Sequence, residues 1–293
     1  MKRIESLIHN KLDFSFDKKY AAIIGSAPSK GARSPLLWNK AFKSLCLNTK
    51  MFPFDIGDNN LDHVLDYLKN DPNFIGGAVA VPYKEKVFNW LEKNSNLTKE
   101  SKNIGAVNCL YRGSKNELIG TNTDGEAAKL SLKNNYGSIS NRNILLIGFG
   151  GAAKAVLAYL DKEVSPKGKI LCLTRQFNLP RKYQNVQFIN WLNYEQYMDS
   201  IEIIINCTTL GFGNQIDKSP ISNQILKSKK SLFVFDIVYQ PLETRLLKES
   251  KNLGFNTLNG LEMNLEQAVL AFNYAMNISD HNLKQNIKDA MKN

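Results

Sequence analysis

The chain has 293 residues, which is long for one domain and sufficient for two. Its 43% hydrophobic share is typical of a folded globular protein, and its apolar runs are shorter than the roughly 18 residues that a membrane span needs. The formal net charge is +11, but the lysines are scattered among asparagines and form no basic-aromatic platform. We therefore interpret the charge as a solvated basic surface that attracts anionic small molecules, and we expect neither a nucleic-acid nor a membrane partner.

The N-terminal segment and the cysteines indicate a cytoplasmic protein. Residues 1–14 contain acidic and polar residues where an export signal would be continuously apolar. The four cysteines lie far apart, at Cys46, Cys109, Cys172 and Cys207. They form no CxxC pair, so we interpret them as reduced, buried thiols. The three histidines, His9, His63 and His281, fit no ligand or triad spacing, and no metal site is predicted.

The first 122 residues alternate between runs of strand length and segments with helical spacing. Strands are expected at 20–25, at 51–56 and in the run AVAV at 78–81, and helices at 35–46, at 60–69 and after Pro82. Ser34 before Pro35 has the pattern of an N-cap followed by proline at the first helical position. Two further strand-like runs, IGAVNCLYR and ELIGTNTDG, surround a polar turn. This part is therefore predicted to be an α/β domain.

The run ILLIGFGGAA at 144–153 is the motif around which the second half is organised. A short apolar strand breaks into glycines and then into helical spacing, with Gly148, Gly150 and Ala153 in the GxGxx(G/A) positions of a dinucleotide-binding turn. Glycines permit a sharp turn and the close approach of backbone amides to a pyrophosphate, and the helix N-terminus attracts the anion. The motif alone is also compatible with a glycine-rich turn that binds nothing.

The segments around this turn continue the alternation. A helix is expected at 125–134, strands at 169–174, 201–207 and 232–237, and a last helix after Gly260. Alternating strands and helices predict an α/β fold with a Rossmann-type, doubly wound parallel sheet. We assign residues 1–122, completed by 262–293, to a substrate domain to which the C-terminal helix returns, and 123–261 to a nucleotide domain. The ligand cleft is expected between the two, at the carboxyl ends of the strands.

Two residues are candidates for proton transfer. Lys84 in VPYKEK follows a predicted strand and lies in the first turn of a helix, where the helix dipole disfavours the ammonium form. Such a lysine can exchange a proton with a substrate. Asp124 ends the run GTNTDG at another strand-to-helix turn. Each alone is also explained as a surface lysine or an N-cap aspartate, but both fall at strand ends that face one expected cleft.

Six motifs in order, GAVNCL, GTNTDG, IGFGGAAKAV, IINCTTLG, FDIVYQPLETRLL and GLEMNLEQAVLAF, resemble the shikimate dehydrogenase family over residues 20–272. The resemblance implies a small domain for a hydroaromatic acid and a Rossmann domain for a nicotinamide cofactor. It implies that Lys84 and Asp124 are the catalytic pair. Implied substrate contacts are Ser34, Asn108, Tyr239 and Gln267. Implied cofactor contacts are Gly148, Gly150, Gly151, Ala152, Ala153, Thr174, Arg175, Thr208 and Gly260. Taken singly, Asn108 or Gln267 would more often be a turn or capping amide.

The end of the second strand of the nucleotide domain favours NADP(H) over NAD. An NAD site would have an aspartate or glutamate there to accept from the ribose hydroxyl. This chain has Thr174-Arg175-Gln176, with Arg181 and Lys182 downstream. A guanidinium can pair with a 2′-phosphate and stack on adenine. The family's NADP pattern, Asn-Arg-Thr followed by a further arginine, is matched in part, because Thr174 and Gln176 are substitutions.

Three alanines depart from the family pattern on the substrate side. Ala32 lies where the family usually has the first serine of Ser-x-Ser-Pro, and Ala78 and Ala80 replace the asparagine and threonine of Asn-Val-Thr-Val-Pro. Each lost hydrogen bond to a charged or buried group costs roughly 1 to 3 kcal/mol of binding. Either nearby residues compensate, with Arg33, Ser29 and Lys30 as candidates for the substrate carboxylate, or the ligand differs.

The leading hypothesis is an NADPH-dependent oxidoreductase that reduces 3-dehydroshikimate to shikimate in aromatic amino acid biosynthesis. The first alternative is a paralogue that acts on quinate or another small alicyclic hydroxy acid. The second is a nucleotide-binding protein without turnover. The sequence leaves open which of Lys84 and Asp124 carries the proton, and whether the protein is a monomer or a homodimer.

Overall fold

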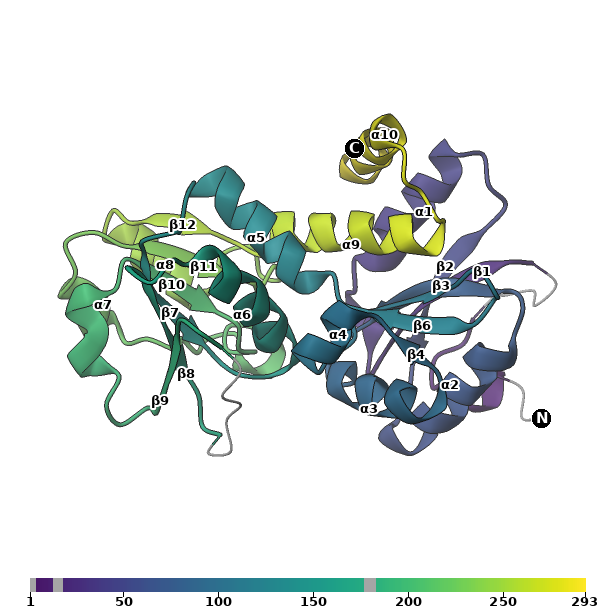
Figure 1. Cartoon of the computed structure of the whole chain (residues 1–293), viewed down its shortest axis with the longest axis horizontal. Coiled ribbons are helices and arrows are strands. Elements are labelled where there is room, and N and C mark those ends of the chain that lie inside the picture. Colours follow the sequence, from purple (N-terminus) through teal and green to yellow (C-terminus); the bar gives the residue numbers. More distant parts are fainter. Residues whose placement is uncertain (1–3, 13–17, 177–182) are drawn as a thin grey trace. The chain divides into compact units, whose positions relative to one another are not determined.

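The computed structural model describes residues 4–12, 18–176 and 183–293. The chain forms two compact units: residues 1–123 with 265–293 make unit 1, and residues 124–264 make unit 2. Each unit is built around one six-stranded sheet (Figure 1). In the described part of the chain, no helix is both long and apolar enough to cross a membrane.

The sheet of unit 1 is mixed. Its strands, in spatial order, are β2 (Lys50–Asp55), β1 (Tyr20–Gly25), β3 (Phe74–Val79), β5 (Cys109–Arg112), β6 (Leu118–Thr121) and β4 (Asn96–Leu97). β1 runs parallel to β2 and β3, whereas β5 runs antiparallel to β3 and β6. The carboxyl ends of β1, β2, β3 and β6 therefore meet the amino end of β5 at one edge of the sheet.

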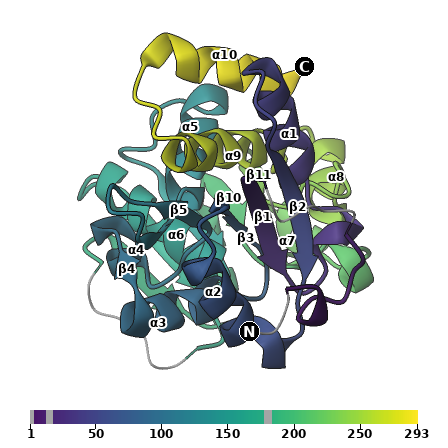
Figure 2. The ribbon, with the colours of Figure 1, turned by 90° about the vertical axis from the view of Figure 1, so that its right-hand side faces the viewer.

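Alternate residues of β1 enter two different cores, because side chains alternate across a strand. Tyr20, Ala22 and Ile24 pack with α2 (Leu61–Asn70) and α3 (Lys84–Asn94). Ala21 and Ile23 pack with α1 (Ser34–Ser44), the part of α9 (Leu261–Ala275) from Leu265 on, and α10 (His281–Lys292). Figure 2 shows α10 lying across α1. The sheet is thus covered on both faces, and the C-terminal helices complete unit 1, as the sequence predicts. The remaining helices and turns of the unit are α4 (Lys99–Ile104) and short 3₁₀ turns at Ile4–Ser6, Pro28–Lys30 and Asp58–Asn60.

The sheet of unit 2 is parallel throughout, which confirms the doubly wound fold. Its strands, in spatial order, are β12 (Asn256–Leu258), β11 (Phe233–Asp236), β10 (Ile203–Asn206), β7 (Asn143–Ile147), β8 (Lys169–Leu173) and β9 (Val186–Ile189). The helices are α5 (Asp124–Asn135), α6 (Gly151–Glu163), α7 (Asn223–Lys227) and α8 (Arg245–Asn252), with 3₁₀ turns at Glu195–Ser200 and Gly213–Gln215. α5 lies beside α6, and Gly125 permits this contact because a Cβ there would lie 2.3 Å from the carbonyl oxygen of Ala155.

Several local predictions in unit 1 are wrong. The third strand is Phe74–Val79 rather than 78–81, and its two glycines lie inside it. Gly77 is required there because a Cβ would lie 1.8 Å from the carbonyl oxygen of Ala22 on β1. Ser34 is the first residue of α1 rather than its cap, and the capping residue Arg33 makes no side-chain cap among the described residues. Cys46 is exposed, whereas the other three cysteines are buried.

Other elements gave too weak a sequence signal. α9 is not the last helix, because α10 follows it and buries only Ile287 and Met291, one turn apart. α7, α8, β9 and β12 are short, and their apolar residues do not form a pattern long enough to predict them. Polar surface helices and edge strands carry little hydrophobic periodicity, so such omissions are expected.

Candidate active site

A buried cluster of amide and hydroxyl groups lies at the edge of the unit 1 sheet. The Asn108 side chain is 2% exposed, Thr123 1% and Gln267 8%. Asn108 Nδ2 donates to Thr123 Oγ1 at 3.0 Å and to Gln267 Oε1 at 3.4 Å. Asn108 Oδ1 accepts from the Thr123 amide at 2.8 Å and from its hydroxyl at 3.3 Å. The structure therefore brings two predicted substrate residues, Asn108 and Gln267, to one place.

The backbone holds Asn108 in this cluster from two sides. Its amide donates to the Thr121 carbonyl at 3.2 Å, and its carbonyl accepts from the Val79 amide at 2.8 Å. The single proton of the Thr123 hydroxyl is shared between Asn108 Oδ1 and the Gln267 carbonyl, which lies at 3.2 Å, and this contact ties the segment after β6 to α9. Rigid, buried amide and hydroxyl groups are suited to hydrogen-bond the hydroxyls of a small polar ligand.

Lys84 is the first residue of α3, as predicted, and is half-buried. Its carbonyl accepts from the Val107 amide at 2.9 Å, so the start of α3 is joined to the residue before Asn108. The hydroxyl of Tyr83 donates to the Ile56 carbonyl at 2.6 Å and fixes the same helix start from the other side. The backbone of Lys84 is thereby anchored beside the amide cluster.

The three alanines that depart from the family pattern belong to one apolar cluster. Ala78 is buried, Ala32 and Ala80 are half-buried, and all three pack in the core that also contains Leu265 and Val269 of α9. Gly25 approaches Ala80 closely, since a Cβ at Gly25 would lie 3.0 Å from the Cβ of Ala80. Where the family pattern has polar side chains, this chain therefore has three alanines that pack in one apolar cluster.

Of the three residues that could compensate for these alanines, Ser29 is already hydrogen-bonded within the protein. The amide of Ser29 donates to Asp55 Oδ1 at 2.9 Å, and its hydroxyl donates to Asp55 Oδ2 at 2.5 Å. The backbone and side-chain donors of Ser29 are thus engaged by a carboxylate of the protein itself. Lys30 is exposed and Arg33 is half-buried. Ser34, the remaining polar residue of this loop-helix junction, is 4% exposed.

In unit 2 the glycine turn has the geometry that a dinucleotide requires. Gly148 has a φ of 103°, which favours glycine, and its amide donates to the Leu173 carbonyl at 2.8 Å. α6 begins at Gly151, and its N-cap is Gly150, which has no side chain that could occupy the helix N-terminus. Ala153 is fully buried, as the close packing of this helix demands. The turn thus fits a pyrophosphate at the N-terminus of α6, where Gly151 and Ala152 supply backbone amides.

The end of β8 is the predicted place for the adenosine ribose. Thr174 is buried, and its hydroxyl accepts from the Gln176 amide at 3.1 Å. The Gln176 side chain donates to the Phe149 carbonyl at 3.4 Å, which joins this strand end to the glycine turn. Arg175 is exposed. Arg181 and Lys182, the further basic candidates, lie outside the described residues.

Asp124, Thr208, Tyr239 and Gly260 also belong to unit 2. Asp124 is the first residue of α5 and is 4% exposed. The pKa of the Cys207 thiol is raised by burial first, and then by the charges of other groups that include Asp124. Tyr239, beyond β11, is half-buried. Gly260 is buried, and a Cβ there would lie 1.9 Å from the carbonyl oxygen of Ile237.

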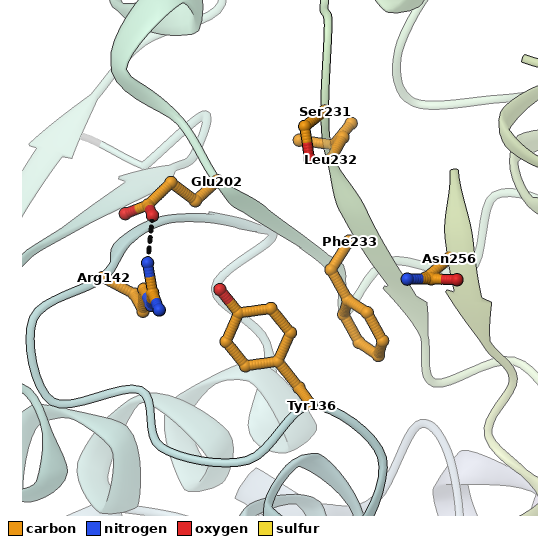
Figure 3. A pocket seen from close by; sticks show the side chains of 7 residues that line it. All are labelled: Tyr136, Arg142, Glu202, Ser231, Leu232, Phe233 and Asn256. Carbon is orange, nitrogen blue, oxygen red and sulfur yellow. Dashed lines mark hydrogen bonds and ion pairs between the residues drawn. The ribbon is translucent and has the colours of Figure 1, made fainter. Parts of the chain in front are cut away.

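A separate pocket of about 270 Å³ lies at the amino ends of the unit 2 strands (Figure 3). Its lining comprises Tyr136, Arg142, Glu202, Ser231, Leu232, Phe233 and Asn256. Arg142 Nη1 donates to Glu202 Oε1 at 2.6 Å, and the Arg142 guanidinium lies 5.7 Å from the centre of the Tyr136 ring. The glycine turn and Thr174 follow the carboxyl ends of the same sheet, so this pocket contains none of the predicted site residues.

Sequence reasoning assigned no role to three residues that shape these sites. Thr123 lies in the GTNTDG motif and joins Asn108 to α9. Asn206 and Asp236 are the last residues of β10 and β11, and both are fully buried. A polar residue at the end of an otherwise apolar parallel strand is the sequence signal that marks these last two positions.

Comparisons with known proteins place this arrangement in context. Residues 23–110 match the family model of the shikimate dehydrogenase substrate binding domain. A shikimate dehydrogenase (NADP(+)) of Methanocaldococcus jannaschii is 33% identical over 262 residues, which cover 87% of this chain and 90% of the relative. A crystal structure of a shikimate dehydrogenase in complex with NADP+ has a TM-score of 0.78 at 30% identity, covering 95% of this chain and 96% of its own. A shikimate 5-dehydrogenase from Listeria monocytogenes in complex with shikimate and NAD has a TM-score of 0.76 at 25% identity, covering 96% and 98%.

Proposed function

The chain belongs to the shikimate dehydrogenase family, and from this premise we propose that it is an NADP-dependent dehydrogenase that interconverts 3-dehydroshikimate and shikimate. The observation that carries the proposal is the similarity to NADP(+)-dependent shikimate dehydrogenases along 87% of the chain. Unit 1 binds the hydroxy acid, and unit 2 binds the cofactor.

On the substrate side, the neutral cluster is suited to recognise ring hydroxyls. Asn108 and Gln267 are buried and held by Thr123, so they lose little side-chain entropy when a ligand binds. A site that hydrogen-bonds substrate hydroxyls discriminates strongly against analogues that lack them, because its polar groups are then left unpaired. Ser34 and Tyr239 are assigned further substrate contacts by the family resemblance.

Proton transfer is assigned to Lys84 and Asp124. When the ring carbonyl becomes an alcohol, the oxygen takes up a proton, and in the reverse direction it loses one. An amine at the start of α3 and a carboxylate at the start of α5 can both exchange a proton with such an oxygen. The cofactor, when bound, supplies or accepts the hydride.

NADP(H) is the cofactor that the residues of unit 2 fit. The glycine turn with Gly148 and Gly150 accommodates the pyrophosphate at the start of α6. Arg175 is exposed two residues after β8, and we assign it to the 2′-phosphate because a guanidinium can pair with that group. Thr174 occupies the position at which an NAD site would have an acidic residue.

The first prediction tests the role of Lys84. NADPH oxidation with 3-dehydroshikimate is expected for the wild type, and Lys84→Ala should lower kcat between about 10²- and 10⁴-fold because a proton-transfer group is lost. Lys86→Ala is the matched control, since Lys86 lies on the same helix, is exposed and pairs with Asp58. Undiminished activity of Lys84→Ala would remove this residue from the mechanism.

A second candidate function is favoured by the alanine cluster. Ala32, Ala78 and Ala80 pack in one apolar cluster, and they suit a cyclic acid that differs from shikimate in the groups that the family's polar side chains hold. A panel of quinate, shikimate and related alicyclic acids, each with NADP and NAD, distinguishes the two candidates, because a true substrate should exceed the others by orders of magnitude in kcat/KM. Tight NADPH binding without turnover on any acid would instead indicate a nucleotide-binding protein.

A further inference from the structure

The carboxyl ends of β10 and β11 hold a buried polar network that none of the assigned roles uses. The Asp236 side chain is fully buried and accepts three hydrogen bonds. Thr244 Oγ1 donates to Asp236 Oδ2 at 2.7 Å, while Asn206 Nδ2 and the Val238 amide donate to Oδ1 at 3.0 and 3.1 Å. Both carboxylate oxygens are therefore engaged, and the side chain is fixed in one orientation.

Asn206 connects this carboxylate to the loop Cys207–Leu210. Its Oδ1 accepts from the Thr208 amide at 3.0 Å and from the Thr208 hydroxyl at 2.7 Å. Its Nδ2, which donates to Asp236, also donates to the Leu210 carbonyl at 3.3 Å. The Leu210 amide in turn donates to Thr208 Oγ1 at 3.1 Å. The loop is thus folded around one asparagine whose orientation depends on Asp236.

The same loop contacts the glycine turn. The Cys207 amide donates to the Ile147 carbonyl at 2.9 Å, next to the start of the turn. A Cβ at Gly148 would lie 3.2 Å from both the Cys207 carbonyl oxygen and Thr208 Cγ2. A displacement of the loop by a few tenths of an ångström would therefore change the space beside Gly148.

We propose that Asp236 is a positioning residue for the cofactor: through Asn206 it fixes the loop Cys207–Leu210 against the glycine turn and so sets the affinity for NADP(H). The proposal rests on the proposed function for the identity of the ligand, and on the hydrogen bonds of unit 2 for the order of the loop. Asp236 acts through Asn206 and the loop, and not by direct contact with the cofactor.

An acid is the residue type that this position needs. Three donors converge on one side chain, and a carboxylate is the compact group that accepts from all of them. An asparagine can keep two of the three contacts as acceptor and reverse the third, because the Thr244 hydroxyl can also accept. Alanine removes all three and leaves Asn206 Nδ2 with only its longer hydrogen bond, to the Leu210 carbonyl at 3.3 Å.

The experiment compares Asp236→Ala with Asp236→Asn and with Glu202→Ala. Glu202 is the matched control, because it accepts from the Asn143 amide at 3.0 Å at the opposite, amino end of the same sheet. Two quantities are measured for each full-length variant at pH 7.5: the Kd of NADPH by fluorescence titration, and hydrogen exchange of the amides in 207–210 without cofactor. For Asp236→Ala we expect a Kd raised about tenfold and loop exchange about tenfold faster.

For Asp236→Asn and Glu202→Ala, a Kd within about 1.5-fold of the wild type is expected. Steady-state kinetics of Asp236→Ala should show a raised KM for NADPH with a smaller change in kcat, as befits lost ground-state binding. If Asp236→Ala does not fold, Thr244→Val, which removes one donor to Asp236 at nearly constant volume, should raise Kd and speed loop exchange in the same direction by about threefold.

The outcomes separate this proposal from the proposed function. A wild type that does not bind NADPH overturns the proposed function, whereas the exchange rates of the loop still report on Asp236. A wild type that binds NADPH, together with an Asp236→Ala variant of unchanged Kd and unchanged loop exchange, overturns the positioning role alone. Faster exchange with an unchanged Kd would show that the loop does not set cofactor affinity, and would also overturn it.

Discussion

Two buried polar clusters, one in each unit, differ in charge. The cluster of Asn108, Thr123 and Gln267 in unit 1 is made of neutral amides and a hydroxyl. The cluster of Asn206, Asp236 and Thr244 in unit 2 contains a carboxylate. Each cluster lies at the edge of its own sheet where the carboxyl ends of the parallel strands meet. The neutral cluster is suited to hold the hydroxyls of a ligand, whereas the charged cluster holds the protein backbone in shape.

The difference has an electrostatic consequence. None of the three side chains in the neutral cluster titrates in the physiological range, so the hydrogen bonds among them do not change with pH. Asp236 is fully buried, and burial raises its pKa to about 6, although the hydrogen bonds from Thr244, Val238 and Asn206 act in the opposite direction. We therefore predict that breaking the hydrogen bonds among Asn108, Thr123 and Gln267 costs the same stability at all pH values, whereas a change at Asp236 costs a different amount at low and at high pH.

The largest expected effect breaks the neutral cluster. Asn108→Ala removes the acceptor of the Thr123 amide and hydroxyl and the partner of Gln267, all of them buried. We expect a loss of about 4 kcal/mol in the free energy of unfolding, because several buried polar groups lose their partners at once. Urea unfolding at pH 5 and pH 7.5 should give the same loss.

A matched control for this prediction is Asn89→Ala, which truncates an exposed asparagine of α3. It should change the free energy of unfolding by less than about 0.5 kcal/mol. A loss for Asn108→Ala that differed between the two pH values by more than the error of the measurement would contradict the description of this cluster as neutral.

The next effect concerns pH in unit 2. The folded pKa of Asp236 is about 6, above the ordinary value of 3.8, so between these values the folded state holds a proton that the unfolded state has lost. Stability is then greatest below pH 3.8 and falls as the pH rises through 6, by about 3 kcal/mol in total for a two-unit shift. Cys207 interacts electrostatically with Asp236, and the charges of Cys172 and Asp124 also act on Cys207.

The measurement is the free energy of unfolding of the wild type minus that of Asp236→Asn, from pH 4 to pH 7.5. The subtraction cancels the titration of the other carboxylates, since both proteins contain them. The difference should decrease by about 2.4 kcal/mol across this range and level off above pH 7. A difference that increases with pH would mean that the hydrogen bonds outweigh burial and that the folded pKa lies below the ordinary value.

The two clusters also differ in how far the sequence predicted them. The glycine turn was predictable because a tight strand-to-helix turn beside a pyrophosphate accepts few residue types, and Gly148 has the positive φ that this requires. Asn108 and Gln267 were located through the family resemblance. Thr123, Asn206 and Asp236 were missed because a polar residue at a strand end has many local explanations, and some of their partners are distant in the chain: Thr123 bonds Gln267, 144 positions away, and Asn206 bonds Asp236, 30 positions away.

The fold, too, was predictable where the signal is local and not where it depends on residues distant in the chain. Alternating strands and helices predicted both sheets, since parallel strands need helical crossovers and bury long apolar runs. The position of β3 was wrong because its glycines were taken as punctuation, whereas Gly77 is required by the backbone of a strand 55 positions earlier in the chain, at Ala22. The alanines Ala32, Ala78 and Ala80 were recognised as departures, but their shared apolar surroundings depend on α9, which is distant in sequence.

The smallest expected effect compares one threonine from each cluster. Among the described residues, Thr123 Oγ1 bonds neutral groups at 3.0 to 3.3 Å, whereas Thr244 Oγ1 donates to a carboxylate at 2.7 Å. A hydrogen bond to an ionised acceptor contributes more, so at pH 7.5 Thr244→Val should cost about 2 kcal/mol and Thr123→Val about 1 kcal/mol of unfolding free energy. At pH 4.5 Asp236 is protonated, and the cost of Thr244→Val should approach that of Thr123→Val. Equal costs at both pH values would show that Asp236 is neutral in the folded protein at pH 7.5. The two clusters would then not differ in charge, but only in their position in the fold.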